Sequence, residues 1–92
     1  MTVYGFLRAG NGVVYQLEKP VNVIGREDKS VDIALKSRTV SSQHATIEFK
    51  EKVFITDMQS LNGTFVNQVR LTNETKELKH GDVLRFGYDT TS

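Results

Sequence analysis

Residues 45–57, ATIEFKEKVFITD, carry the pattern that decides the fold. Every second residue from Ala45 to Phe49 is apolar, and the residues between them are polar. This alternation is typical of a β-strand with one buried face. The same alternation resumes at Val53, directly after the charged pair Glu51-Lys52. The stretch therefore predicts two antiparallel strands joined by a short turn.

Strand patterns recur along the whole chain. Eleven valines, four isoleucines and nine threonines stand against three alanines and seven leucines, a balance that favours strands over helices. Ten segments bounded by turn residues are predicted as short strands: Val3–Arg8, Val13–Leu17, Asn22–Ile24, Ile33–Leu35, Ala45–Phe49, Val53–Ile55, Thr64–Val66, Val69–Leu71, Lys76–Leu78 and Asp82–Phe86. We therefore expect an all-β fold, an antiparallel β-sandwich whose loops gather at its ends.

Length and charge limit the classes of partner. The 92 residues contain no cysteine, and they suit a single domain over residues 1–92. Twelve basic and eleven acidic residues give a net charge of +1, so nucleic acid is not an expected partner. The longest uninterrupted apolar stretch is Val3–Leu7, much shorter than the roughly 18–20 residues that span a bilayer, so no membrane segment is expected.

An enzyme would have to use the polar residues of the predicted loops. Ser41, His44 and Asp57 could act as nucleophile, base and orienting carboxylate. On an extended segment, however, side chains three residues apart point to opposite faces, and no glycine-flanked nucleophile turn surrounds Ser41. We therefore expect no hydrolase and no catalytic residues.

Metal and cofactor sites are not expected either. His44, His80 and Asp57 are scattered and lack the close ligand spacings of zinc sites. The segment Gly10–Gly12 precedes a predicted strand, whereas a dinucleotide-binding loop precedes a helix.

A binding site for a phosphorylated residue needs fewer groups. If the loops bring Arg26, Ser41 and Asn62 together, they offer a guanidinium fork, a hydroxyl and an amide. An arginine can hold a phosphate dianion with two hydrogen bonds, and a serine hydroxyl can donate another. The amide suits the peptide backbone beside the phosphate.

The spacing of these residues resembles the forkhead-associated (FHA) domain. The shared anchors run from about Val23 to Gly87 and are Gly25-Arg26, Ser41-x-x-His44, Asp57-x-x-Ser60-x-Asn62-Gly63-Thr64, Gly81-Asp82 and Phe86-Gly87. The resemblance implies an eleven-stranded β-sandwich that binds phosphothreonine peptides through loops at one end. It also implies a non-catalytic domain without a cofactor.

The resemblance assigns roles to individual residues. It implies phosphate contacts from Arg26, Ser41 and Ser42, a peptide-backbone contact from Asn62, structural support from Gly25, His44 and Gly63, and peptide specificity from Leu61, Gln68 and Arg70. Two positions depart from the pattern. Many relatives carry asparagine, arginine or lysine at Ser42, and threonine or serine is frequent at Leu61.

Two further expectations follow from the resemblance. FHA domains normally end with a strand that pairs with the first strand, and no apolar run after Gly87 predicts it, so the domain would end before its last strand with the edge of Val3–Arg8 open. The segments 60–67 and 84–90 resemble FHA domains of centrosomal and microtubule-associated coiled-coil proteins. This implies an intracellular location in the cytoplasm or on the cytoskeleton, the centrosome included, and leaves the nucleus open.

One alternative function stays open beside phosphothreonine binding. Some FHA domains act as phosphate-independent scaffolds, which use a sheet face or an open edge to dock a partner or a second copy of the chain. A homodimer is thus a further possible assembly.

Overall fold

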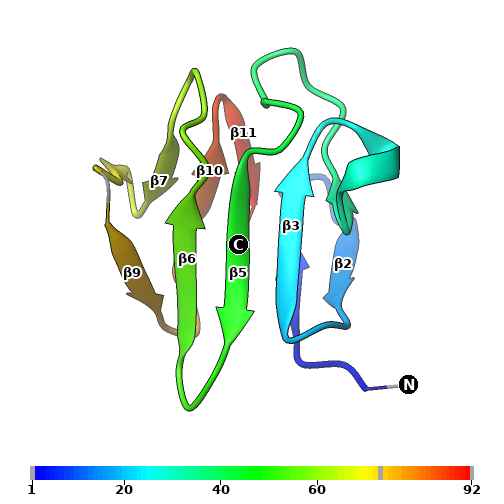
Figure 1. Ribbon diagram of the computed structural model, residues 1–92, viewed down its shortest axis with the longest axis vertical. Coiled ribbons are helices and arrows are strands. Elements are labelled where there is room, and N and C mark those ends of the chain that lie inside the picture. Colours follow the sequence, from blue (N-terminus) through cyan, green and yellow to red (C-terminus); the bar gives the residue numbers. More distant parts are fainter. Residues whose placement is uncertain (1, 73, 92) are drawn as a thin grey trace.

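The computed structural model describes residues 2–72 and 74–91, which form eleven strands and one short 3-10 turn (Figure 1). The elements are β1 (Gly5–Arg8), β2 (Val14–Leu17), β3 (Val21–Gly25), η1 (Asp28–Ser30), β4 (Ile33–Ala34), β5 (Ala45–Phe49), β6 (Val53–Asp57), β7 (Thr64–Val66), β8 (Val69–Arg70), β9 (Thr75–Leu78), β10 (Leu84–Phe86) and β11 (Asp89–Thr91). All ten predicted strands are present. In this part of the chain no helix is long and apolar enough to cross a membrane.

The strands form two layers and a separate hairpin. One sheet has the order β4-β3-β5-β6-β9, a second has the order β11-β10-β7-β8, and β1 pairs with β2. Figure 1 shows β7, β10 and β11 behind β3, β5 and β6. The buried apolar side chains of both layers and of the hairpin form one core cluster. The predicted all-β sandwich is therefore confirmed.

The β5–β6 hairpin supplies the centre of this core. Its register places Ile47 opposite Ile55, and neither side chain is exposed to solvent. Ala45 is equally buried at the start of β5. The alternating apolar side chains of residues 45–57 therefore face the second sheet, as the sequence predicts.

One strand pair departs from the antiparallel prediction. β3 and β4 run parallel, with Ile24 beside Ile33. Residues 26–32 carry the chain back along β3 before β4 begins. Asp32 holds this return, because its N–H donates to the Val23 carbonyl (2.8 Å) and its carboxylate accepts the Val23 N–H (2.8 Å).

A strand follows Gly87, contrary to the sequence prediction. β11 pairs with β10 after a two-residue turn in which Gly87 has a φ of +62°. A positive φ at the first turn position suits a tight hairpin. In the described part of the chain β1 pairs with β2 alone, so β11 does not close onto the first strand. Whether the domain has a further strand stays a prediction.

The loops that carry the predicted site residues Arg26, Ser41 and Asn62 lie at one end of the sandwich. Figure 1 shows the connections β3–β4, β4–β5 and β6–β7 together at the upper end, whereas the β5–β6 turn lies at the lower end. The β7–β8 turn, Asn67-Gln68, follows the end of β7 that lies away from the β6–β7 loop. Asn67 bonds to Asp82 and Val83 there. Gln68 is therefore not brought to the loop end, where its predicted role in specificity would place it.

The turn at Gln68 can be stabilised. Asn67 and Gln68 have φ values of +50° and +70°, and glycine adopts this region without the roughly 1–2 kcal/mol that other residues lose there. We expect Gln68→Gly to raise the free energy of unfolding by about 0.5–1 kcal/mol in urea titrations. Glu51→Gly is the control, since Glu51 is an exposed turn residue without a positive φ and should lose stability. A less stable Gln68→Gly chain would contradict this view of the turn.

Candidate functional site

The β3–β4 and β4–β5 loops are joined through their backbones next to Gly25. The Arg26 N–H donates to the Ser41 carbonyl (3.0 Å), and the Glu27 N–H reaches the Ser42 carbonyl (3.4 Å). The two loops approach so closely that a Cβ on Gly25 would lie 2.1 Å from the Ser42 carbonyl oxygen. Gly25 is therefore needed for its small size, and its supporting role at a binding site stays a prediction.

His44 connects the β4–β5 loop to the β6–β7 loop. Its Nδ1 accepts the Ser41 N–H (3.0 Å), and its Nε2 lies 2.7 Å from the Gly63 carbonyl. These two partners require a neutral ring with the proton on Nε2, because Nδ1 accepts and a carbonyl only accepts. The ring is fully buried and meets Phe86 edge to face at 5.7 Å. Burial lowers the pKa of His44, although the Gly63 carbonyl and the Asp57 carboxylate oppose the shift.

Gly63 joins three segments at one carbonyl. Besides His44, its oxygen accepts the Gly87 N–H (2.8 Å) from the β10–β11 turn. Gly63 has a φ of +91°, and a Cβ there would lie 2.7 Å from the Arg70 Nε. Both its conformation and its crowding therefore favour glycine at this position.

Asp57 organises the β6–β7 loop from inside. Its carboxylate accepts the Ser60 N–H (3.1 Å) and the hydroxyls of Ser60 and Thr64, the latter at 2.6 Å. Burial raises the pKa of Asp57, but the hydrogen bonds from Ser60 and Thr64 outweigh this, so the pKa lies below its ordinary value. A carboxylate charged at neutral pH therefore holds the loop that carries Asn62.

Ser41 and Asn62 are each anchored through part of their polar groups. The Leu61 N–H donates to Ser41 Oγ (3.2 Å), so the hydroxyl hydrogen of Ser41 is left to donate elsewhere. Asn62 Nδ2 donates to the Thr39 carbonyl (2.9 Å), which leaves one amide hydrogen and the amide oxygen. The Thr39 hydroxyl oxygen accepts a further hydrogen bond from the Tyr88 N–H (2.9 Å). Sequence reasoning missed Thr39, because no motif marks it.

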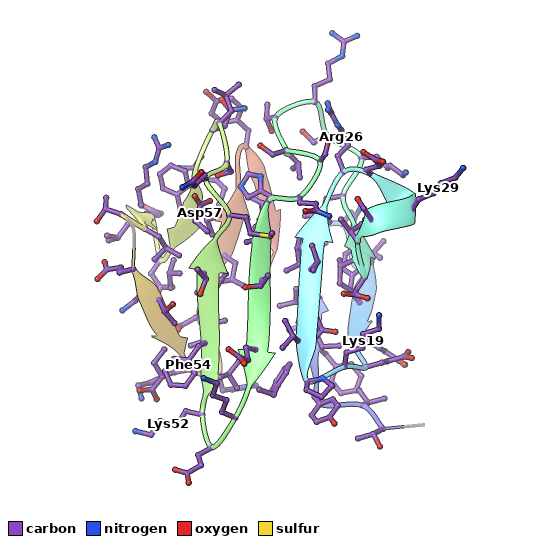
Figure 2. All side chains as sticks on the ribbon, in the orientation of Figure 1. Lys19, Arg26, Lys29, Lys52, Phe54 and Asp57 are labelled. Carbon is purple, nitrogen blue, oxygen red and sulfur yellow. The ribbon has the colours of Figure 1, made fainter. Side chains whose placement is uncertain are left out.

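Arg26 completes the arrangement from the β3–β4 loop. Its side chain is exposed, and among the side chains that the structure describes none pairs with its guanidinium. Figure 2 shows Arg26 at the loop end of the sandwich and Lys29 pointing away from it. The loops of Arg26, Ser41 and Asn62 are thus fastened to one another, and each side chain keeps hydrogen-bond donors for a ligand.

The other predicted site residues occupy more peripheral places. Ser42 is exposed beside Glu27, and Leu61 is 83% exposed on the β6–β7 loop. Arg70 lies against Gly63 from the neighbouring strand β8. Leu61 and Arg70 therefore border the loop end.

The geometry does not form the catalytic triad considered above. The backbone N–H of Ser41, not its hydroxyl, bonds to His44, and His44 Nε2 faces the Gly63 carbonyl instead of Asp57. Both ring nitrogens of His44 are occupied, so this residue cannot ligate a metal without breaking the loop contacts. Its contacts tie two loops together, and its support of a binding site stays a prediction.

Replacing Gly25 should damage the fold at this point. Gly25→Ala places a methyl group on the Ser42 carbonyl, and we expect a loss of about 1–3 kcal/mol in the free energy of unfolding, measured by urea titration. Gly10→Ala is the matched control, because a Cβ there meets nothing within 4 Å and Gly10 has no positive φ. Equal stability of the two variants would contradict the close approach of the loops.

The buried neutral His44 predicts a pH-dependent stability. The unfolded chain binds a proton near pH 6.5, whereas the folded chain has a lower pKa, so the free energy of unfolding should fall as pH drops below about 6.5. The loss is at most about 1.4 kcal/mol for each pH unit. Urea titrations from pH 8 to 5 measure it, and carboxylates with lowered pKa values titrate below this window.

The histidine responsible can be identified by substitution. His80→Gln should keep the pH dependence, since His80 is exposed, whereas His44→Gln should remove it at the expense of stability. Stability that is equal at pH 5.5 and 7.5 in the unmodified chain would contradict a neutral His44.

Comparisons with known proteins identify the family to which this chain is similar. Residues 22–87 match the sequence profile of the FHA domain. The chain is 36% identical over 77 residues to the protein phosphatase 1 regulatory inhibitor subunit PPP1R8 homolog of Arabidopsis thaliana, an alignment that covers 80% of this chain. It spans only 21–24% of the length of the first curated relatives that it matches. These matches do not support the narrower resemblance to centrosomal coiled-coil proteins.

Two solved structures resemble the chain over nearly its whole length. Mycobacterium tuberculosis EmbR in complex with a low-affinity phosphopeptide has a TM-score of 0.88 at 30% identity, covering 95% of this chain and 23% of EmbR. The MEK1 FHA domain in complex with a phosphothreonine peptide of HOP1 has a TM-score of 0.79 at 28% identity, covering 94% of this chain and 90% of that domain. With the profile match and this shared fold, the chain belongs to the FHA domain family.

Proposed function

We propose that this chain is a non-catalytic reader of phosphothreonine in a partner protein. Arg26 and Ser41 would hold the phosphate, and Asn62 would hold the peptide backbone beside it. The observation that carries the proposal is that the loops of all three residues are joined, with side-chain donors left over: His44 and Gly63 link the loops of Ser41 and Asn62, and the Arg26 N–H bonds to the Ser41 carbonyl.

The phosphate would be held by placed donors and not by the overall charge. A phosphothreonine carries about −1.5 to −2 charges at neutral pH, whereas the chain has a net charge of only +1. The guanidinium of Arg26 offers a planar fork that matches two phosphate oxygens, and the Ser41 hydroxyl adds a charge-assisted hydrogen bond. Ser42 is exposed next to them and could add a peripheral contact.

Asn62 suits the backbone of an extended peptide. One amide hydrogen is used on the Thr39 carbonyl, which fixes the orientation of the side chain. The remaining hydrogen and the amide oxygen can bond to a peptide carbonyl and a peptide N–H. A bound strand would thus be held at a set distance from Arg26.

The relatives support binding over catalysis. EmbR and the MEK1 domain were both solved with phosphopeptides, and the FHA domain is a non-catalytic binding fold. The activity of the longer proteins that contain such domains is not carried over. An intracellular location, in the cytoplasm or on the cytoskeleton, stays a prediction.

Peptide titration with an Arg26 variant tests the proposal. We expect a phosphothreonine peptide from an oriented library to bind, and its unphosphorylated twin not to bind, by isothermal titration calorimetry. Arg26→Ala should weaken binding at least about tenfold, because a charge-assisted pair contributes about 1.5–3 kcal/mol. Lys29→Ala is the control, since Lys29 lies in the same connection and points away (Figure 2).

Equal affinity for both peptide forms would overturn phosphate recognition. The alternative, a phosphate-independent scaffold, has its own observation in the β1–β2 hairpin, where Phe6 and Val14 are 63% and 53% exposed. A dimer that forms without peptide and survives Arg26→Ala, seen by analytical ultracentrifugation, would favour that alternative.

A further inference from the structure

Three side chains form a row across the outer face of the four-stranded sheet. Phe65 on β7 lies opposite Arg70 on β8 and opposite Arg85 on β10. Thr64 and Val66, on either side of Phe65, are buried in the core. Because side chains alternate along a strand, Phe65 and its two cross-strand neighbours share the outward face.

The phenyl ring holds both guanidinium groups. The Arg85 Cζ lies 3.8 Å from the centre of the Phe65 ring, and the Arg70 Cζ lies 5.9 Å from it. Both distances are within the range of cation–π attraction. Arg85 is fixed further by a hydrogen bond to the Gly87 carbonyl (2.7 Å). The two cations are therefore oriented before any ligand arrives.

This pair of cations has no acidic partner among the side chains that the structure describes. Several lysines of the chain are placed differently, because each lies near a carboxylate: Lys19 near Asp32, Lys50 near Glu48, and Lys52 and Lys79 near Glu77. Because β8 and β10 flank β7, Arg70 and Arg85 come from opposite sides of Phe65, and an anion near the ring would be attracted by both positive charges. Their free N–H groups form planar forks, which suit carboxylate and phosphate oxygens.

The row begins where the proposed phosphothreonine site ends. The Arg70 guanidinium lies against Gly63, the residue after Asn62. Figure 1 places β7 on the opposite side of the loop end from the β3–β4 connection that carries Arg26. A peptide that runs from Arg26 past Asn62 would therefore continue toward Arg70.

We propose that Arg70 and Arg85, oriented by Phe65, form a second anion-binding subsite for the same peptide. The subsite takes a carboxylate or a second phosphate that lies a few residues from the phosphothreonine. This inference rests on the proposed function and names its ligand class: acidic or doubly phosphorylated peptides. Phe65 acts here as a positioning residue, and the two arginines contact the ligand.

Peptide sets separate the two possible anions. Each set contains three kinds of phosphothreonine peptide. The first has neutral flanks. The second has glutamates either N-terminal or C-terminal to the phosphothreonine, and the third has a phosphoserine at those same positions. We expect about tenfold tighter binding when the anion lies on the side that reaches Arg70, and similar binding to the neutral peptide when it lies on the other side. Comparison of the glutamate and phosphoserine arms identifies the preferred anion.

Variants then test the assignment through the ratio of acidic-peptide to neutral-peptide affinity. Arg70→Gln should lower this ratio from about ten to near one. Arg70→Lys should retain only part of the preference, since it keeps the charge without the fork. Phe65→Leu should lower the ratio although no charge is removed. Lys50→Gln is the control for net charge, since Lys50 follows β5 at the far end of the hairpin, and it should leave the ratio unchanged.

The outcomes distinguish this subsite from the proposed function. Binding of phosphothreonine peptides with no preference for flanking anions, or a preference that survives Arg70→Gln in a chain that unfolds at the normal temperature, overturns the second subsite alone. An equal decrease of the ratio in Lys50→Gln would assign the preference to the general field and would also overturn it. Failure of every phosphothreonine peptide to bind overturns both proposals.

Discussion

A buried neutral imidazole holds the functional end of this sandwich together. His44 lies immediately before β5 of the five-stranded sheet, and Gly63 lies immediately before β7 of the four-stranded sheet. The hydrogen bonds from Ser41 to His44 and from His44 to Gly63 therefore cross from one layer to the other. Because both ring nitrogens are hydrogen-bonded, the free-energy cost of burying a polar group is offset. Only the tautomer with the proton on Nε2 fits these partners. This bridge ties the β4–β5 loop, which carries Ser41, to the β6–β7 loop, which carries Asn62.

The distribution of charged side chains over the fold cannot be read from the composition. A net charge of +1 excludes a strong general attraction for anions, yet arginines without carboxylate partners among the described side chains border the loop end. Around them the backbone is fixed by Gly25 and Gly63, which allow close approaches that a Cβ would block. Rigid loops and long charged side chains thus complement one another, because the loops set the positions and the side chains supply the charge.

Where the sequence was misleading, the reason lies in backbone pairing. β11 contains no apolar residue, and it forms because Gly87 permits a tight return and β10 offers an unpaired edge. The parallel pairing of β3 with β4 depends on contacts between Asp32 and Val23, which no local pattern reveals. Nearly all residue types can form main-chain hydrogen bonds. A strand, or a parallel strand direction, that depends on these bonds alone is therefore hard to predict from the amino-acid composition.

Three signals determined ten strands and the sandwich class from the sequence alone: the alternation in residues 45–57, the excess of valine, isoleucine and threonine, and the turn residues between segments. The family spacing likewise identified Arg26, Ser41 and Asn62 as the residues to examine. Only the tertiary structure decided which of their donors are already used, that Gln68 lies away from the loop end, and that Phe65 aligns two arginines beside Gly63. Those facts depend on distances between segments far apart in the chain, and such distances are set by packing, which a one-dimensional pattern does not contain.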